Sequence, residues 1–361
     1  MGLVRKYGQR VVTREKVRNY ILAQREKALK AVEVKSLPYI LNLDTLNGCN
    51  LKCPFCPTGT GQHERPKARL PLEHAKNVID AVKDHVLEVR FYNWGEPFLN
   101  PNIFEIIRHA REAGLYTIIN SNFSIRVDHL AEKILDSGLD FLSLSVDGLE
   151  QGTLEIYRRK ANSELVFENV RKLVAARRGR GLSRPRIELA FLVFRHNEHE
   201  VPRLEAMGKE LGVDHIYPRR AYIFHESLVP EHPDFQPRQY EFTGTCDFLY
   251  QELTIEATGS VSPCCTSMSS KWDIGKIQDL EDMRRFWNAP EFRAMRALYA
   301  GDRNFKQITG GKNILCQYCS LVSLRPDGAD GRKGKLSPLP PSFVADGKTY
   351  AHGFDNLKAT L

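Results

Sequence analysis

The stretch that decides the fold is Cys49-Asn-Leu-Lys-Cys53-Pro-Phe-Cys56, which places three thiols within eight residues. It directly follows ILNLDTL at 40–46, an apolar run typical of a buried strand. Three thiolates are one short of closing a tetrahedral zinc site or of saturating a [4Fe–4S] cluster. A cluster in this loop would therefore keep one iron open. A zinc site with a distant fourth ligand such as His63, and plain reduced thiols, are the alternatives.

From residue 38 onward, short apolar or β-branched runs alternate with amphipathic stretches. The expected strands cover 40–46, 89–94, 116–121, 141–146, 187–194 and 215–224. The expected helices cover 74–86, 102–114, 128–138, 163–179 and 199–212, and three of them end in a glycine that suits a left-handed C-cap, at Gly114, Gly138 and Gly212. This alternation predicts an α/β fold with a parallel sheet and right-handed crossovers. Periodicity leaves open whether the sheet closes into a barrel.

The Cys-x3-Cys-x2-Cys spacing after the first strand, with Phe55 before the third cysteine, resembles the signature of the radical S-adenosylmethionine (radical SAM) superfamily. The resemblance covers about residues 38–225 and implies a partial (β/α)6 barrel of the TIM type. It implies that Cys49, Cys53 and Cys56 hold a [4Fe–4S] cluster whose open iron binds S-adenosylmethionine. An electron from the cluster then yields a 5′-deoxyadenosyl radical, which takes a hydrogen atom from the substrate.

A second segment, Asn93-Trp-Gly-Glu-Pro97, lies at the end of the second expected strand. It resembles the Gly-Gly-Glu-Pro motif of the superfamily, with Trp94 in place of the first glycine. The resemblance implies that Gly95 and Glu96 hold the methionine ammonium of the cofactor.

Polar residues also end the third and fourth expected strands. The resemblance implies that Ser121 and Ser145 reach the ribose or carboxylate of the cofactor, and that Phe55 belongs to the same site. Asn122 and Gly148 are interpreted as turn residues, because Asn and Asp-Gly are common where strands end.

A second cysteine group follows later in the chain. Cys246, Gly259 and Cys264 resemble the Cys-x9–15-Gly-x4-Cys opening of SPASM and twitch domains, and Cys316-x2-Cys319 supplies a closing pair. The resemblance implies that the four cysteines hold one auxiliary [4Fe–4S] cluster, since the cysteines that a second auxiliary cluster needs are absent. A structural zinc site is the alternative.

Cys265 is left over next to this group. Such a cysteine is most often a small buried hydrophobe. The alternative is a donor that returns a hydrogen atom to a substrate radical, as in epimerases that this chain resembles.

Substrate residues in a barrel of this kind belong at the carboxyl ends of the strands. The candidates are Tyr92, Arg195, His196, Tyr217, Arg219 and Arg220. Arg195 and Tyr217 rank highest, although surface ion pairs and helix starts explain many such residues equally well.

Three functions remain open for such an enzyme. The main hypothesis is oxidation of a hydroxyl-bearing carbon in a sugar or cyclitol, with the auxiliary cluster accepting an electron, because the four-cysteine arrangement resembles that of 2-deoxy-scyllo-inosamine dehydrogenases. The alternatives are an epimerase that uses Cys265, and modification of a peptide. A zinc-binding protein that holds nucleic acid is the hypothesis outside enzymes. An external donor such as flavodoxin or ferredoxin is the expected electron source.

Composition adds the remaining expectations. The 361 residues carry a net charge of +8, an excess too small to favour a nucleic-acid partner. We find no signal peptide and no long apolar run, so we expect a cytoplasmic protein without a membrane partner. We expect a basic helical extension at 1–37, the barrel at 38–228, a small cysteine-rich domain at 229–323 and a Gly/Pro-rich tail at 324–361.

Overall fold

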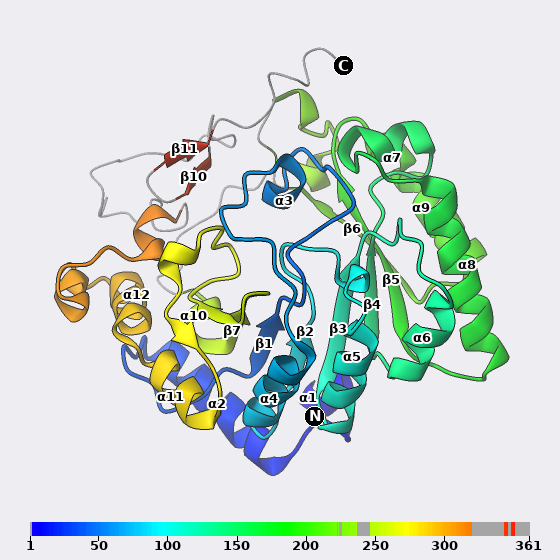
Figure 1. Cartoon of the computed structure of the whole chain (residues 1–361). Helices are drawn as coiled ribbons and strands as arrows, with labels where there is room; N and C mark the ends of the chain where they lie inside the picture. Colours follow the sequence, from blue (N-terminus) through cyan, green and yellow to red (C-terminus); the bar gives the residue numbers. More distant parts are fainter. Residues whose placement is uncertain are drawn as a thin grey trace.

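The structure is a computed structural model that describes residues 2–221, 223, 226–236 and 246–319, together with the backbone at 343–345 and 348–350. Six strands of its main sheet run parallel and are adjacent in chain order (Figure 1). They are β1 (Ile40–Leu43), β2 (Glu88–Arg90), β3 (Tyr116–Ser121), β4 (Phe141–Ser145), β5 (Arg186–Val193) and β6 (His215–Arg220). The expected parallel α/β fold is confirmed. β2 and β6 are shorter than expected, since they end at Arg90 and Arg220.

The helices between these strands pack on the outer face of the sheet. They are α4 (Leu72–Val82), α5 (Ile103–Glu112), α6 (Leu130–Ser137), α8 (Ser163–Gly179) and α9 (Val201–Leu211). In α5 the buried positions are Ile103, Ile106, Ile107 and Ala110, the spacing that gives a helix one apolar face. Gly114, Gly138 and Gly212 have φ angles of 78°, 71° and 72°, as expected for left-handed C-caps.

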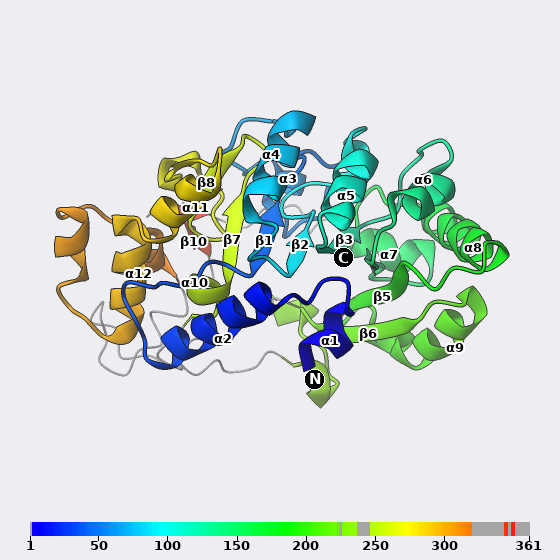
Figure 2. The same ribbon diagram turned by 90° about the horizontal axis from the view of Figure 1, so that it is seen from below.

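The N-terminal extension forms α1 (Gly2–Tyr7) and α2 (Arg14–Ala28). Both helices lie on the side of the sheet opposite α4 and α5 (Figure 2). Tyr7 packs edge-to-face on Tyr116 of β3, with 5.5 Å between ring centroids, and Lys6 lies 3.2 Å from the carboxylate of Glu88 in β2. The extension therefore covers the inner face of the sheet near the amino ends of its strands.

The sheet does not stop at β1. β7 (Glu252–Ile255) pairs with β1 in parallel, so that Leu43 faces Ile255, and β8 (Ser260–Ser262) and β9 (Gly275–Lys276) follow in antiparallel order. The result is one nine-stranded sheet that runs from the barrel into the cysteine-rich region. The domain boundary between 228 and 229 stays a prediction, and the sheet crosses it.

Helices of the cysteine-rich region complete the same core. α10 (Phe248–Gln251) precedes β7, and α11 (Leu280–Trp287) and α12 (Pro290–Ala300) follow β9. Trp287 and Phe292, both buried, belong to one apolar cluster with Leu41 of β1 and Leu253 of β7. The two regions therefore share a single hydrophobic core.

Short elements make up the connections. They are α3 (Pro57–Thr60), α7 (Gln151–Tyr157), η1 (Pro97–Leu99), η2 (Glu198–Glu200), η3 (Glu226–Leu228), η4 (Pro233–Phe235), η5 (Ser270–Trp272), η6 (Phe305–Thr309), η7 (Leu315–Tyr318) and the hairpin of β10 (Phe343–Ala345) and β11 (Lys348–Tyr350). Apart from that hairpin, the tail expected at 324–361 lies outside the described residues.

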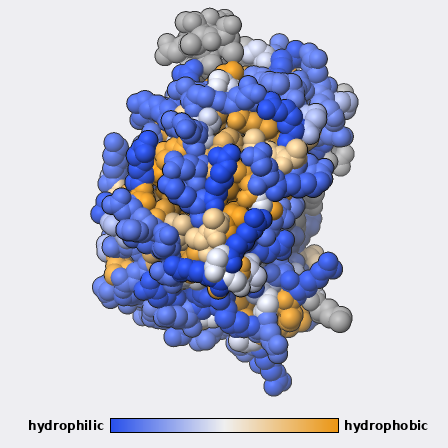
Figure 3. Space-filling view, turned by 90° about the vertical axis from the view of Figure 1, so that its right-hand side faces the viewer, coloured by the Kyte–Doolittle hydropathy of each residue, from blue (hydrophilic) through white to orange (hydrophobic). Residues whose placement is uncertain are grey.

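The surface over the right-hand helices of Figure 1 is mainly hydrophilic, with apolar residues visible between the polar ones (Figure 3). Within the described part of the chain, no helix is both long and apolar enough to cross a membrane.

Candidate functional site

The first cysteine group, Cys49, Cys53 and Cys56, lies in the loop between β1 and α3. The loop is ordered by hydrogen bonds of its own: the Cys56 N–H donates to the Cys53 carbonyl (3.2 Å), and the Leu51 N–H donates to the Cys49 sulfur (3.4 Å). α3 packs directly on the loop, because a Cβ at Gly59 would lie only 2.6 Å from the Cys53 carbonyl oxygen. Glycine is therefore required at this position.

The surroundings of these three thiols fit an iron–sulfur cluster. The thiols pack in one apolar cluster with Leu51 and Leu154. Burial, with smaller contributions from the charges of Glu96, Cys53 and Cys56, raises the pKa of Cys49 to about 12. A bound cluster must therefore displace the thiol protons.

A single-ion site is not formed in the described residues: no three His, Cys, Asp or Glu side chains converge on one ion position there. A cubic cluster binds each thiolate through a different iron, so it needs sulfurs that stand further apart than the ligands of one zinc ion.

A buried positive charge lies beside the first group. The Arg158 guanidinium donates to the carboxylate of Asp147, whose side chain is fully buried. Burial raises the pKa of Cys53, and the hydrogen bond and charge of Arg158 oppose that rise. Arg158 was not selected from the sequence, because an isolated arginine carries no motif of its own.

The 93–97 segment is attached to the start of the cysteine loop. The Glu96 N–H donates to the Gly48 carbonyl (2.9 Å), and a Cβ at Gly95 would lie 1.6 Å from the Leu46 carbonyl oxygen. No side chain fits at Gly95. The close approach of two backbones explains this glycine without reference to a ligand.

Glu96 is buried and accepts three hydrogen bonds, from the Ser121 hydroxyl (2.8 Å) and from the N–H groups of Asn122 (2.8 Å) and Phe98 (3.2 Å). Burial raises its pKa to about 7. A carboxylate offers about four acceptor positions, so Glu96 retains capacity for a further donor. The structure thus places the expected residues Glu96 and Ser121 in direct contact.

Asn122 makes the turn contact that we expected, because the Ser124 N–H donates to its side-chain oxygen (2.9 Å). It also contacts the first cysteine group: its side-chain amide lies 3.7 Å from the Cys49 sulfur and donates to the Asn50 side chain (3.1 Å). Ser145, by contrast, donates to the side chain of Asn120 (3.0 Å).

Phe55 is part of an aromatic cluster over the first group. Its ring centroid lies 5.5 Å from that of Tyr157 and 6.1 Å from that of Phe194, and Phe194 stacks on His196 at 5.4 Å. Burial lowers the pKa of His196 to about 4, so this ring is neutral at physiological pH.

The second cysteine group is assembled from three separate segments. Cys316 belongs to the main apolar cluster, and Cys246 and Cys319 pack against that cluster. Burial raises the pKa of Cys316 well above its usual value, with contributions from the charges of Cys319, Cys264 and Cys246. The Tyr299 hydroxyl donates to the Cys319 sulfur (3.5 Å). The structure therefore brings together all four predicted ligands.

Cys265 lies between the second group and the inner face of the sheet. Its thiol hydrogen-bonds to the Cys264 sulfur and to the Glu252 carboxylate, contacts that with burial raise the pKa of Cys265 well above its usual value. Its carbonyl accepts from the side-chain amide of Asn93 (3.0 Å), whose oxygen accepts from the Trp94 indole (3.1 Å). The residue that departs from the family motif thus supports a contact between the two regions.

Charged residues line the inner face of the sheet near Glu252. Arg90 bridges two carboxylates, with its Nη1 2.7 Å from Glu252 and its Nε 2.5 Å from Glu88. Burial raises the pKa of the neighbouring Tyr92 to about 12. Tyr92 was a candidate from the sequence, whereas the ion pairs of Arg90 were not predicted, because Glu252 lies on β7, far from β2 in the chain.

The two highest-ranked substrate candidates lie nearer the surface. Arg195 donates to the Val229 carbonyl (3.0 Å) and pairs with Glu231 (2.7 Å), both in the segment after β6. Tyr217 is 47% exposed, and the Arg219 guanidinium lies 5.5 Å from its ring centroid. Arg195 thus binds the segment after β6, while Tyr217 is partly exposed on β6 and stacks on His215 at 6.0 Å.

Two family models match the chain. The model of the radical SAM superfamily matches residues 43–203, and the model of the SPASM iron–sulfur cluster-binding domain matches residues 246–320. The matches contain the first and the second cysteine group, respectively.

Curated relatives match somewhat more than half of this chain. An AdoMet-dependent heme synthase of Methanosarcina barkeri is 28% identical over 212 residues, 58% of each chain. A PqqA peptide cyclase of Bradyrhizobium diazoefficiens is 28% identical over 193 residues, which are 53% of this chain and 48% of the relative. The chain spans about half the length of the curated relatives it matches.

Solved structures share the fold. SuiB of Streptococcus suis superposes with a TM-score of 0.58 at 14% identity, over 78% of this chain and 72% of that one. SuiB bound to S-adenosylmethionine gives a TM-score of 0.55 at 12% identity, over 85% and 75%. The expected partial barrel with a C-terminal iron–sulfur domain is confirmed.

The arrangement of the site agrees with both family matches. It has three cysteines after β1, a Gly-Glu-Pro segment packed against them, and four further cysteines near β7. The chain therefore belongs to the radical SAM superfamily, in the subgroup that carries a SPASM-type iron–sulfur domain.

Proposed function

We propose that the chain is a radical SAM enzyme that modifies a peptide and uses two [4Fe–4S] clusters. Cys49, Cys53 and Cys56 would hold the first cluster, and the second group of four cysteines would hold the auxiliary one. The observation that carries the proposal is that these four thiols lie together near β7. β7 pairs with β1, and β1 leads into the loop of the first cysteine group. When bound, the first cluster and S-adenosylmethionine supply a 5′-deoxyadenosyl radical.

The relatives favour a peptide substrate over the sugar or cyclitol of the main hypothesis. Several of them are PqqA peptide cyclases, and SuiB has been solved with its precursor peptide SuiA, at a TM-score of 0.55 and 13% identity. These similarities support the peptide alternative.

The residues of the first site would hold the cofactors and exclude water. Glu96 retains an acceptor position for the methionine ammonium, and Ser121 and Asn122 fix its orientation. Arg158 would balance the negative charge of a cluster bound at Cys53. Gly95, Ser145 and Phe55 stay proposed cofactor-binding residues.

The inner face would hold the substrate between the two cysteine groups. Arg90 and Glu252 offer a buried cation and a carboxylate there, and Cys265 offers a thiol that burial keeps protonated. Tyr217 and Arg195 stay proposed substrate residues. An external donor such as flavodoxin or ferredoxin would reduce the first cluster.

The thiol of Cys265 favours one second candidate, inversion of a stereocentre. Its contact with the Glu252 carboxylate places it on the inner face of the sheet, where a thiol could return a hydrogen atom to a substrate carbon. Oxidation of a hydroxyl-bearing carbon requires no such thiol.

Anaerobic reconstitution tests the proposal. After incubation with iron and sulfide, we expect about eight irons per chain, the content of two cubic clusters. Under strong reductant, the protein should cleave S-adenosylmethionine and modify one of the short peptides encoded beside it, but none of a panel of sugars and aminocyclitols. Stoichiometric zinc without iron would refute the radical chemistry, and turnover of a sugar alone would refute the peptide.

A further inference from the structure

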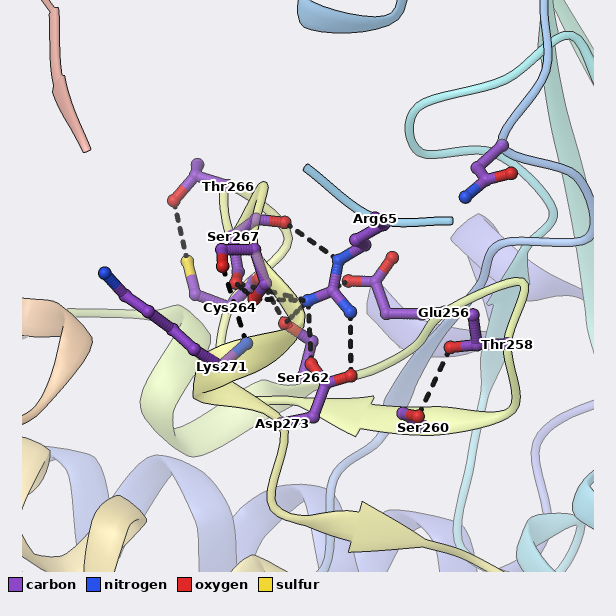
Figure 4. A network of polar contacts seen from close by, with 12 residues as sticks. Arg65, Glu256, Thr258, Ser260, Ser262, Cys264, Thr266, Ser267, Lys271 and Asp273 are labelled. Atoms are coloured by element: carbon purple, nitrogen blue, oxygen red, sulfur yellow. Dashed lines mark hydrogen bonds and ion pairs between the residues drawn. The ribbon is translucent and has the colours of Figure 1, made fainter. Parts of the chain in front are cut away.

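Arg65 lies in the loop from α3 to α4, shortly after the first cysteine group. Its side chain is completely buried, at 0% exposure, although arginine is almost never fully buried unless it is paired. Its guanidinium lies among residues of the segment 256–273 in the C-terminal region (Figure 4). Arg65 therefore links two regions that are far apart in the chain.

Two carboxylates pair with this guanidinium. Asp273 accepts one hydrogen bond from Nη1 (2.8 Å), its other oxygen lies 2.8 Å from Nη2 as an ion pair, and Glu256 lies 3.4 Å from Nη2. A planar guanidinium directs contacts from several nitrogens at once, which the point charge of a lysine does not.

The same guanidinium holds the turn that follows β8. Its Nη2 lies within hydrogen-bonding distance of the hydroxyls of Ser262 (3.3 Å) and Ser267 (3.2 Å) and of the Ser269 carbonyl (3.3 Å). The Ser262 hydroxyl and the Ser267 N–H both donate to the carbonyl of Cys264, at 3.1 and 3.0 Å. Arg65 therefore fixes both flanks of the turn that carries Cys264.

The backbone beside Arg65 is fastened to the first cysteine loop. The side chain of Asn47 donates to the Pro66 carbonyl and accepts from the Ala68 N–H, both at 2.6 Å. Asn47 is buried and lies just before Cys49. A continuous set of contacts thus runs from Cys49 through Asn47 and Arg65 to Cys264.

We propose that Arg65 is a positioning residue that sets the geometry of the auxiliary cluster relative to the first one, by clamping the 262–269 turn onto the loop that follows Cys56. The inference rests on the proposed function, since it assigns a cluster to Cys264. Arg65 itself does not touch the reacting atoms.

The test compares Arg65→Lys, which keeps the charge and removes the fork, with Arg69→Lys, a change at an exposed arginine of the same loop. In the reconstituted full chain, Arg65→Lys should keep its iron and wild-type cleavage of S-adenosylmethionine without substrate. It should shift the midpoint potential of the auxiliary cluster, which electron paramagnetic resonance measures. It should also slow product formation by roughly 10- to 100-fold. If Arg65→Lys and Arg69→Lys have the same midpoint potential and the same rate of product formation, the proposal is wrong.

A second measurement needs no cluster. In iron-free protein, hydrogen exchange of the 262–269 amides should be faster in Arg65→Lys than in Arg69→Lys, because the turn loses its clamp. If the lysine variant does not fold, Asp273→Asn takes its place. It leaves Arg65 intact and removes the charge of its carboxylate partner, and it should give the same increase in exchange. Unchanged hydrogen exchange in the variants would show that Arg65 does not clamp the turn. If the wild-type protein binds no auxiliary iron, the proposed function is wrong, and the exchange measurement alone then decides whether Arg65 clamps the turn.

Discussion

The two cysteine groups of this molecule are built in different ways. The first uses three cysteines within eight residues, so its geometry follows from one loop. The second gathers cysteines from positions 246, 264, 316 and 319, so it depends on the pairing of β7 with β1 and on the turn after β8. A local group tolerates changes elsewhere, while an assembled group should be sensitive to any contact that positions its segments.

The largest expected effect is at the local group. Cys53→Ser should remove the first cluster, lower the iron content from about eight to about four per chain and abolish cleavage of S-adenosylmethionine. Iron analysis and detection of 5′-deoxyadenosine measure these effects. The auxiliary cluster should survive, and its loss would show that the two groups assemble together.

Cys316→Ala should have the converse effect. We expect loss of the auxiliary iron, retention of uncoupled cleavage of S-adenosylmethionine and a strong loss of product, if the auxiliary cluster acts on the substrate as we propose. Paramagnetic resonance of the reduced protein identifies the remaining cluster. Full product formation would contradict a role for the auxiliary cluster in turnover.

The charge beside the first group provides a test of stability. Arg158→Met leaves the buried Asp147 carboxylate without its partner, and the free energy of unfolding of the iron-free protein should fall by about 3–5 kcal/mol. Denaturant titration measures this change. Addition of Asp147→Asn should recover part of the loss, and Arg203→Met, which breaks an exposed pair with Glu150, should leave the unfolding midpoint unchanged.

The acid network near the second group predicts a dependence on pH. Burial raises the pKa of Glu256 to about 7, above its value in the unfolded chain, so the folded state binds the proton more tightly. Its contribution to stability is complete below about pH 4.5 and is lost as the pH rises through about 7, by on the order of 3 kcal/mol. Unfolding of iron-free Glu256→Gln should show a flatter pH profile between pH 5 and 8, and an unchanged profile would contradict the assignment.

The smallest effect on the fold is expected from Cys265→Ala, which removes one sulfur without breaking an ion pair. If the thiol returns a hydrogen atom to the substrate, product formation should stop while 5′-deoxyadenosine still appears. If the chemistry is oxidative or forms a peptide cross-link, turnover should persist. Product analysis by mass spectrometry in deuterated water separates these outcomes.

The comparison also explains what the sequence could predict. The first loop, Gly95, Glu96 and most strands carry local signals, because spacing and periodicity encode contacts between near neighbours. The four cysteines of the second group were found through their family spacing. Arg65, Arg158 and the contact of Asn122 with Cys49 were missed, because their roles arise only when distant segments meet. Helix α4 ends at Val82, four residues before the predicted end, since helix boundaries are weakly encoded.

The pairing of β7 with β1 has a practical consequence. A truncated protein that ended after β6 would leave β1 with an unpaired edge and would strip the shared core of Trp287 and Phe292. Exposed edges and apolar surface promote aggregation, so the barrel half should fail as an independently expressed fragment. Chimeras that exchange the C-terminal half between relatives would have to transplant β7 and its partner strand together.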